Sequence, residues 1–316
     1  MKRLIFIFSL ILFISTDIFS AGIREERNSQ QEMSFSENIR GSSETSITGS
    51  SVWKVTKNGK SLYLGGSVHI LRAKDFPLPK EYDYAFSKSE VQVLEADTEQ
   101  MNDPELTQYL LSQMFLPEGV SIASLLEPEV YDHLTQVCSE YGIPIYNVAK
   151  IKPSMLVTTL TMLQIEKLGF NEKGIDDYFL TKAKKEKKPV LFLESVQTQI
   201  DMFVSLGEGY ENEFVSYSLL DMEHTEEALE VMLFEWRRGQ IGTNEETLIE
   251  MRDEWPQMYK VLFTDRHDAW IPQIEKFIAS GKVHFVIAGL LHMHGQDGLR
   301  QRLEKLGYTV EQVVIK

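Results

Sequence analysis

Two segments near opposite ends of the chain share one pattern, and this pattern limits the folds that the sequence allows. SLYLGGSVH, residues 61–69, is apolar and β-rich and ends in Gly-x-x-His, and a helical stretch and the apolar run VQVLEAD, residues 91–97, follow it. HFVIAGLLH, residues 284–292, a helical stretch and YTVEQVV, residues 308–314, repeat the same order. The repeat predicts two related βαβ-like halves that share one mixed sheet, which is an α/β fold.

The sequence between these halves is mostly helical. Ahead of the first half, Asn58-Gly59 lies between two alternating apolar runs and predicts a hairpin. Apolar residues at helical spacing predict helices over residues 121–142, 151–169 and 174–188. A strand at PVLFLES and acidic helices from about 195 to 280 follow. We interpret this helical middle as an insertion between the two halves.

The first 50 residues are expected to lie outside the folded domain. Residues 1–21 begin with the basic MKR and continue with an apolar run, which is typical of a secretory signal peptide. The cleavage site would place Ile18 or Phe19 where signal peptidase prefers a small residue, so an uncleaved membrane anchor is the alternative. Residues 22–50 are polar and serine-rich, which predicts a disordered leader. The sequence therefore predicts a periplasmic or secreted domain over residues 51–316.

Charge and cysteine content limit the class of partner and the kind of cross-link. The 47 acidic and 32 basic residues give a formal net charge of −15, which argues against a nucleic-acid-binding surface. Cys138 is the one cysteine of the chain, so no intramolecular disulfide can form, and its helical setting predicts a small buried apolar residue. These features favour an acidic enzyme or binding protein.

The two Gly-x-x-His motifs are the strongest candidates for chemistry. In each motif an apolar strand leads into glycine (Gly65 and Gly66, or Gly289), which permits positive φ and a close backbone approach. The imidazole of His69 or His292 then follows just past the strand end. Ligands gather outside the carboxyl ends of strands in α/β sheets, so we expect the two imidazoles to converge on one metal ion. Taken singly, each motif is more simply a loop histidine.

Two glutamates and one arginine stand where they could complete such a site. Glu95 and Glu194 each follow an apolar strand, where a charged side chain is rarely buried unless it is paired or binds a ligand. Arg266 lies at a predicted helix start, where the helix dipole disfavours a cation, and this indicates pairing with a carboxylate or an anionic intermediate. Helix-start or salt-bridge roles for the glutamates and a surface position for Arg266 are the alternatives.

The other histidines are interpreted from their positions. His294 follows His292 by two residues, and in a strand-like loop both could face one way. His133, His224 and His267 lie on predicted helices and are interpreted as surface residues. The sequence has no His-Glu-x-x-His and no Cys-x-x-Cys, which excludes the standard zincin and zinc-ribbon sites.

The order and spacing of these motifs resemble a known family. The segments YLGGSVHIL, VQVLEAD, GIDDYFLTKA, KPVLFLESVQTQ, FTDRHDAW and VIAGLLHMHGQDGLRQRLEKLGYTV are together similar to the TraB/GumN family, which includes the TIKI metalloproteases. The resemblance runs from about Trp53 to Val314. It implies a mixed sheet of the erythromycin-esterase/ChaN-like type, with two related halves.

The resemblance also implies roles for individual residues. His69 and His292 would be the paired motif histidines, and Glu95 would be their acidic partner. Asp176 would be the supporting carboxylate of the family's Gly-x-Asp element. Further characteristic polar positions match Glu194 and Arg266.

The sequence departs from the family pattern at three positions. The usual Arg-Asn is Arg266-His267 here. Leu291 replaces a smaller residue before the motif histidine and could narrow the site, and His294 could offer a competing ligand. None of these departures removes a predicted ligand.

These observations lead to one favoured function and two alternatives. The favoured function is an exported metal-dependent hydrolase acting on a peptide or protein, with Mn, Co or Zn held by His69, Glu95 and His292. Glu194 would be a general base or orient a ligand, and Arg266 would stabilise the oxyanion. The alternatives are a non-catalytic haem- or peptide-binding protein on the same scaffold, and a metal-free esterase that uses His and Glu as acid and base.

Overall fold

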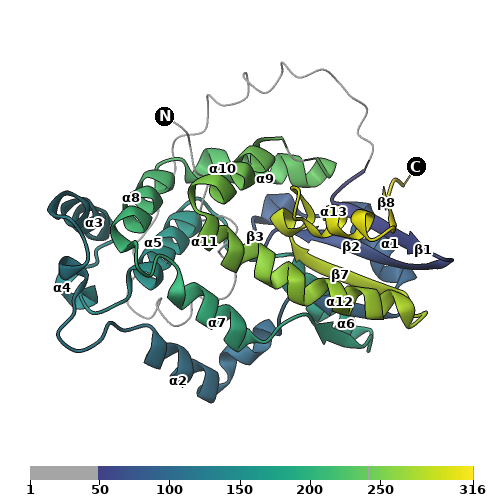
Figure 1. The fold of residues 1–316 in the computed structure, drawn as a ribbon, viewed down its shortest axis with the longest axis horizontal. Helices are drawn as coiled ribbons and strands as arrows, with labels where there is room; N and C mark the ends of the chain where they lie inside the picture. The colour runs from purple at the N-terminus through teal and green to yellow at the C-terminus, as the bar shows by residue number, and fades with distance from the viewer. Residues whose placement is uncertain (1–48, 241, 316) are drawn as a thin grey trace.

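The computed structural model of the chain describes residues 49–240 and 242–315 (Figure 1). The predicted signal peptide and nearly all of the predicted leader lie outside these residues. The last two leader residues, Gly49 and Ser50, are buried, and the Ser50 carbonyl accepts a hydrogen bond of 2.9 Å from the Gln312 side chain. The folded part therefore includes two residues that the sequence assigned to the leader.

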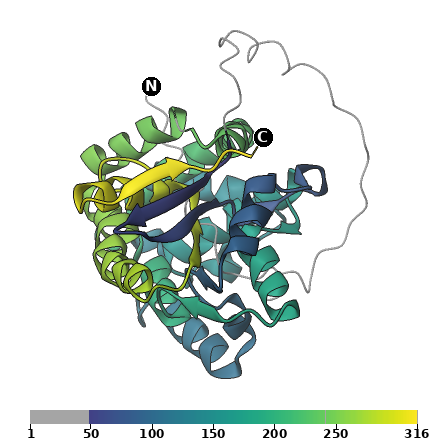
Figure 2. The same ribbon diagram turned by 90° about the vertical axis from the view of Figure 1, so that its right-hand side faces the viewer.

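Within the described residues, six strands form one mixed sheet in the order β6-β4-β7-β2-β1-β8 (Figure 2). Their bounds are β1 Val52–Lys57, β2 Lys60–Ser67, β4 Val91–Leu94, β6 Val190–Phe192, β7 His284–Gly289 and β8 Thr309–Gln312. The strands β6, β4, β7 and β2 are parallel, and β1 is antiparallel to both of its neighbours. The short strands β3 (Ile70–Leu71) and β5 (Glu172–Lys173) pair separately. The predicted α/β class is confirmed.

The structure has thirteen α-helices within the described residues. Their bounds are α1 Lys80–Lys88, α2 Pro104–Gln113, α3 Pro128–Glu140, α4 Ile145–Val148, α5 Pro153–Lys167, α6 Ile175–Lys185, α7 Val196–Ser205, α8 Glu211–Met222, α9 Thr225–Arg238, α10 Thr243–Glu254, α11 Pro256–Tyr259, α12 Asp265–Ala279 and α13 Leu299–Lys305. Helices α2, α3 and α5 begin with proline, which suits a first helical position because no N–H partner is needed there. Helices α5 and α6 confirm two of the predicted helices.

The predicted helix over residues 121–142 is wrong over residues 121–127. Ile122–Ser124 forms a 3₁₀ turn, and α3 begins only at Pro128. Glu127 is extended, with φ −64° and ψ 151°, because a residue before proline is biased away from the helical region. The helical spacing of apolar residues thus extends beyond the helix itself, because Pro128 sets the start of α3.

The hairpin between β1 and β2 is confirmed. Asn58 and Gly59 have φ of 52° and 76°, which is the pair of positive values that a tight two-residue hairpin turn requires. Lys57 pairs with Lys60 across the turn. This hairpin fixes the register in which β2 enters the sheet.

The two βαβ-like halves place their helices on opposite faces of the sheet. Helix α1 connects β2 to β4, and its Tyr82 packs against Phe285 of β7. Helix α13 connects β7 to β8, and its Leu303 shares a second buried cluster with Val286 of β7. The connections that leave the neighbouring strands β2 and β7 thus run in opposite directions along the sheet. Their carboxyl ends form a topological switch point, where α/β proteins bind ligands.

The helical middle lies beside the sheet at the left of Figure 1. Helices α6 and α1 cover one face of the sheet, and α12 and α13 cover the other. Cys138 of α3 is fully buried, as predicted. No helix of the described part of the chain is long and apolar enough to cross a membrane.

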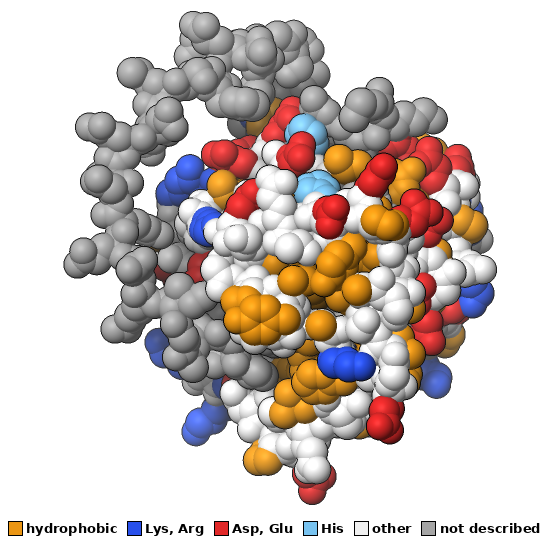
Figure 3. All heavy atoms as spheres, turned by 90° about the vertical axis from the view of Figure 1, so that its left-hand side faces the viewer, with side chains coloured by type: hydrophobic (Ala, Val, Ile, Leu, Met, Phe, Trp, Pro, Cys, Tyr) orange, Lys and Arg blue, Asp and Glu red, His pale blue; other side chains and the backbone are white. Residues whose placement is uncertain are grey.

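The helical end of the molecule carries both apolar and acidic surface. Figure 3 shows hydrophobic side chains near the middle of this face and acidic side chains mainly toward its top and right. The helices α4 and α8 at this end expose Tyr146, Tyr217 and Leu220 by 76%, 39% and 42%. Few basic side chains are visible on the face, which agrees with the acidic composition.

Candidate active site

Four neighbouring parallel strands deliver the predicted site residues to one edge of the sheet. His69 follows β2, Glu95 follows β4, Glu194 follows β6, and His292 lies in the 3₁₀ turn after β7. All four strands point the same way, so their carboxyl ends meet at the switch point. The structure therefore brings together residues separated by more than 200 positions in the sequence.

His69 is held from behind by a carboxylate. Its Nδ1 lies 2.6 Å from Oδ2 of Asp176, and Ser67 donates a further hydrogen bond to the same oxygen. Burial alone would lower the pKa of His69, but the charge and hydrogen bond of Asp176 outweigh burial and raise it. Since the carboxylate fixes Nδ1 as the donor, the imidazole presents Nε2 to the pocket.

The Gly-x-Asp element is attached to the first motif through the backbone. The N–H of Ile175 donates to the carbonyl of Val68 at 3.1 Å, and β3 pairs with β5 beside it. A Cβ atom at Gly174 would lie 2.2 Å from the carbonyl carbon of His69, so only glycine allows this approach. The close contact positions Asp176 behind the imidazole.

Glu95 is almost completely buried, with 1% of its surface exposed. Its Oε1 accepts a hydrogen bond of 2.6 Å from the N–H of Gly289, and its Oε2 accepts from Arg266. Burial raises the pKa of Glu95, and Arg266 opposes this shift. The predicted strand-end carboxylate is therefore paired, with a backbone donor on one oxygen and a cation on the other.

Arg266 connects the two glutamates and the second motif histidine. Its Nε and one terminal nitrogen contact both carboxylate oxygens of Glu194, at 3.1 and 2.6 Å. That nitrogen also contacts Glu95, and the other terminal nitrogen lies 2.8 Å from Nε2 of His292. The predicted pairing with a carboxylate is confirmed.

Arg266 lies in the first turn of α12, as predicted, but this start is not a free helix end. Helix α11, the π-helical turn Lys260–Thr264 and α12 follow one another, and Thr264 keeps helical dihedrals of φ −64° and ψ −50°. The helix dipole at this point is therefore internal, and it gives no reason for Arg266 to be unusual. A π-helical turn beside it is a feature often found at functional sites.

His292 is enclosed by one face of the same helical segment. Phe263, His267 and Trp270 lie with ring centroids 5.1, 5.0 and 4.9 Å from its imidazole, and Arg266 contacts Nε2. These four positions have the i, i+3, i+4, i+7 spacing of a single helical stripe. The interpretation of His267 as a surface residue is wrong, because this side chain is 1% exposed.

The hydrogen bonds of His267 and His292 fix both tautomers. Arg266 can only donate, so Nε2 of His292 accepts, and the proton of the neutral ring is on Nδ1. That Nδ1 lies 2.8 Å from Nε2 of His267, whose Nδ1 lies 2.7 Å from the carbonyl of Asp297. A carbonyl can only accept, so Nδ1 of His267 donates to it and Nε2 of His267 accepts from Nδ1 of His292. The two ends of this hydrogen-bond series therefore assign the same tautomers. Burial lowers the pKa of His267 to about 3 and that of His292 well below its usual range, which keeps both rings neutral.

Gly289 is the point on which the predicted ligands converge. A Cβ atom there would lie 3.0 Å from Nε2 of His69, 3.3 Å from Cδ2 of His292 and 3.5 Å from Oε1 of Glu95. Glycine is therefore needed because side chains approach from three sides.

The motif glycines do not use positive φ, contrary to one expectation from the sequence. None of the three motif glycines has a positive φ: Gly65, Gly66 and Gly289. A Cβ at Gly65 would lie 2.8 Å from the Phe285 ring, and one at Gly66 would lie 2.8 Å from Leu290. The predicted close approach is confirmed, but the groups that approach Gly65 and Gly66 are side chains of β7 and of the turn that follows it.

His294 does not join the other site residues. Its ring packs edge-on against Trp53 at 5.3 Å, and its Nδ1 lies 3.3 Å from Arg300. His292 lies in the 3₁₀ turn Leu290–Met293 and His294 is extended, with φ −122° and ψ 175°, so the expected strand-like loop is not present. His294 is therefore a buried residue that packs against Trp53.

The donor atoms of the site suit a divalent metal, with one obstacle. Imidazole nitrogen and carboxylate oxygen are ligands of Mn, Co and Zn, and each motif imidazole is oriented by a partner on Nδ1. In residues 49–240 and 242–315, however, no three His, Cys, Asp or Glu side chains stand ready to hold an ion. Arg266 occupies Nε2 of His292 and Oε2 of Glu95 instead. As long as Arg266 contacts these two atoms, neither of them is free to bind a metal.

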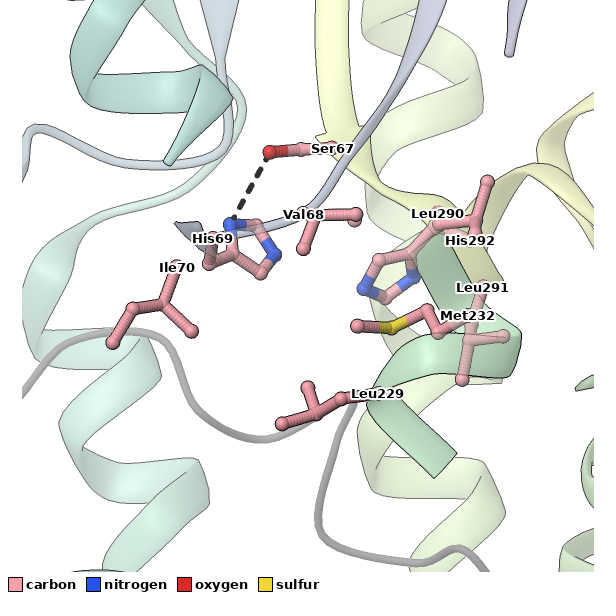
Figure 4. Close-up of a pocket in the computed structure, with 10 residues that line it drawn as sticks. Ser67, Val68, His69, Ile70, Leu229, Met232, Leu290, Leu291 and His292 are labelled. Carbon is pink, nitrogen blue, oxygen red and sulfur yellow. Dashed lines mark hydrogen bonds between the residues drawn. The ribbon is translucent and has the colours of Figure 1, made fainter. Parts of the chain in front are cut away.

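A small pocket opens beside the two motif imidazoles (Figure 4). His69 and His292 lie on either side of it, and Met232 and Leu229 of α9 close it on the side away from Ser67. The helical middle thus supplies one wall of a site whose polar groups come from the sheet.

Comparison with known proteins identifies the family of this chain. The model of the TraB/PrgY/gumN family matches residues 51–312. The chain belongs to the TraB/PrgY/gumN family. This confirms the resemblance found in the sequence, and the match includes every site residue described above.

Two curated proteins are similar to this TraB/PrgY/gumN chain over most of its length. The uncharacterized protein YbaP of Escherichia coli strain K12 is 27% identical over 259 residues, which cover 77% of this chain and 88% of YbaP. The uncharacterized protein YbaP of Shigella flexneri is 27% identical over 256 residues, which cover 76% and 87%. No solved structure matched the chain.

Proposed function

We propose that this chain is an exported metal-dependent hydrolase of the peptidase class. The observation that supports this most is the convergence of His69, Glu95 and His292 around Gly289 at the switch point of the sheet. Each imidazole has a hydrogen-bond partner on Nδ1, Asp176 for His69 and His267 for His292. Such partners orient metal-ligating histidines and raise their basicity.

His69, Glu95 and His292 would hold the ion, and Mn, Co and Zn all suit this donor set. When bound, the metal lowers the pKa of a water molecule and polarises the carbonyl of the bond to be cleaved. Arg266 keeps its two-point contact with Glu194 while it leaves the other two residues. Its guanidinium is then available to stabilise an oxyanion.

Glu194 has an orienting role in this proposal. Both of its oxygens contact Arg266, and one also accepts from Nε1 of Trp270 at 3.1 Å. Gln199 donates to the other oxygen at 2.8 Å. Since these donors already occupy both of its oxygens, the orienting role is favoured over the general-base role.

Metal analysis of the purified full chain tests the proposal. Wild type is expected to hold about one divalent ion per chain and to cleave fluorescently labelled casein with Mn, Co or Zn. His69→Ala and His292→Ala are expected to lose both properties. His294→Ala is the matched control, because it removes a buried histidine of the same loop that lies outside the converging group.

Two results would count against the proposal. If wild type binds none of the three metals, the donor set does not form a metal site. If His69→Ala or His292→Ala binds metal as wild type does, that histidine is not a ligand.

One observation favours a second candidate, the metal-free esterase. Arg266 already lies between Glu95, Glu194 and His292, where it provides positive charge without an ion. His69 and Asp176 would then act as an oriented base. Cleavage of p-nitrophenyl acetate that survives excess chelator and is lost in His69→Ala would support this candidate. The haem-binding alternative stays a prediction, and a Soret band lost in His292→Ala would support it.

A further inference from the structure

The first part of α9, residues 225–232, lies over the candidate site. The cavity that it encloses beside His69 and His292 has a volume of about 30 Å³, which is room for a water molecule or two and not for a peptide. We infer that residues 225–232 are a cover over the site, held closed by an ion pair between Glu230 and Arg72. The inference rests on the proposed function for what enters the site, but the cover itself is argued from contacts of the chain.

Two residues of α9 form the wall that closes the cavity. Leu229 and Met232 lie on the side away from Ser67 (Figure 4), and they are 1% and 8% exposed. Glu95 and His292, which lie deeper in the site, are 1% and 3% exposed. A substrate therefore cannot reach these groups past α9 while the two wall residues keep their places.

An ion pair joins the cover to the loop that follows β3. Arg72 of this loop donates to Oε1 of Glu230 through one terminal nitrogen, and its other terminal nitrogen lies 3.3 Å from Oε2. Arg72 is also fixed within its own surroundings, because Nε lies 2.9 Å from Asp75 and the guanidinium lies 4.3 Å from the centre of the Phe170 ring. The Glu230 side chain is 41% exposed, so it is the part of the pair that can leave with α9.

The last part of α9 is fastened differently. Trp236 is fully buried, its Nε1 donates to the hydroxyl of Tyr82 at 2.6 Å, and its carbonyl accepts two hydrogen bonds from Ser51. Arg237 donates to the carbonyl of Asp75, which ties the loop after β3 to this same part of the helix. The helix thus has a fixed end near Trp236, about which residues 225–232 can move.

The forces that close the cover suit an opening that a substrate can drive. The wall residues Leu229 and Met232 have apolar side chains, which form no hydrogen bond that opening would break. A partly exposed ion pair adds only a modest stabilisation, and salt screens it. A peptide that binds the open form better than the closed one shifts this equilibrium toward opening.

Thiol labelling of the full chain measures the opening. Cys138→Ala removes the native thiol, and Leu229→Cys then places a single thiol in the cavity wall. A further change, Glu230→Ala, is expected to speed the reaction with iodoacetamide about fivefold, the effect of losing such an ion pair. Added NaCl is expected to speed labelling when Glu230 is present and to have little effect in Glu230→Ala. Met232→Cys provides a second reporter in the same wall.

Two matched controls separate opening from a general loosening of the helix. Glu226 is an exposed glutamate of the same helix, and Glu226→Ala is expected to leave labelling of Leu229→Cys unchanged. Leu233 is a buried leucine of α9 outside the cavity lining. A thiol placed there by Leu233→Cys is expected to react at the same rate with and without Glu230→Ala.

Equal labelling of Leu229→Cys in the two glutamate variants, or faster labelling of both leucine positions in Glu230→Ala, would overturn the cover. Faster labelling of the cavity wall alone supports the cover even if the chain cleaves no peptide, so the proposed hydrolase can fail separately. Peptide cleavage by a chain whose labelling does not respond to Glu230→Ala would support the hydrolase and contradict the cover.

Discussion

At the scale of single residues, the site depends on which nitrogen of each imidazole carries its proton. Nε2 of His292 accepts from Arg266, and His267 accepts the Nδ1–H of the same ring at 2.8 Å. The family pattern has asparagine at the position of His267, and an amide oxygen can also accept this proton. His267 is therefore a positioning residue that acts through His292.

Replacing His267 tests this role. His267→Leu leaves the buried Nδ1–H of His292 without an acceptor, which is expected to lower the free energy of unfolding by about 1–3 kcal/mol. Urea unfolding measures the loss, and ¹⁵N NMR is expected to show a shifted Nδ1 resonance of His292, because its proton has lost its acceptor while Arg266 still donates to Nε2. His267→Asn is expected to restore the resonance. An unchanged His292 spectrum in His267→Leu would contradict the role.

His294 provides a prediction about acid stability. Burial and the nearby Arg300 lower the pKa of His294 to about 3, so the folded chain keeps this ring neutral while the unfolded chain protonates it near its ordinary value of 6.5. The stability from the neutral ring is complete above the unfolded pKa and is lost as the pH falls toward the folded one. In His294→Gln, the fall of unfolding free energy with acid is expected to be shallower by about 1.4 kcal/mol per pH unit below about pH 6. The exposed His224, changed to Gln, is the control, and equal slopes in wild type and His294→Gln would contradict the prediction.

At the scale of elements, the attachment of α6 to the first motif decides whether Asp176 reaches His69. Gly174→Ala would bring a Cβ atom to 2.2 Å from the carbonyl carbon of His69, so α6 must move away. We expect a loss of about 1–3 kcal/mol of unfolding free energy, and the Asp176 contact should be lost with it. In Gly242→Ala, by contrast, the nearest atom to the new Cβ is 3.6 Å away, so this variant should be nearly neutral. A Gly174→Ala variant as stable as wild type would contradict the close contact.

The same elements show what the sequence could predict. His69, Glu95, Glu194 and His292 were predicted as one group because each follows an apolar strand, and parallel strands end at a common edge. The contact between Asp176 and His69 joins residues 107 positions apart, and no local pattern indicates it except the resemblance to the family.

His267 was missed because a helical position alone does not tell which face is buried. The signal was present in FTDRHDAW, since Phe263 and Trp270 mark an apolar stripe whose spacing includes positions 266 and 267. The start of the predicted helix over residues 121–142 was misplaced for a similar reason. The spacing of apolar residues indicates which face of a helix is buried, and only Pro128 indicates where this helix begins.

At the scale of the whole molecule, the chain just before β1 ties the sheet to the helical middle. The N–H and hydroxyl of Ser51 both donate to the carbonyl of Trp236 in α9, at 3.1 and 2.8 Å. The N–H of Gly66 donates to the carbonyl of Ser51 at 2.8 Å, and Tyr82 of α1 also donates to it. These hydrogen bonds join α9 to the sheet through a segment at the predicted domain boundary.

Two truncated chains test this connection. A chain of residues 49–316 keeps these bonds and is expected to unfold at the same urea concentration as the full chain. A chain that begins at Trp53 loses Ser51 and leaves the buried Gly66 N–H and Trp236 carbonyl without these partners, which is expected to cost at least about 1–3 kcal/mol. If both truncated chains unfold alike, the segment before β1 does not hold the two parts together.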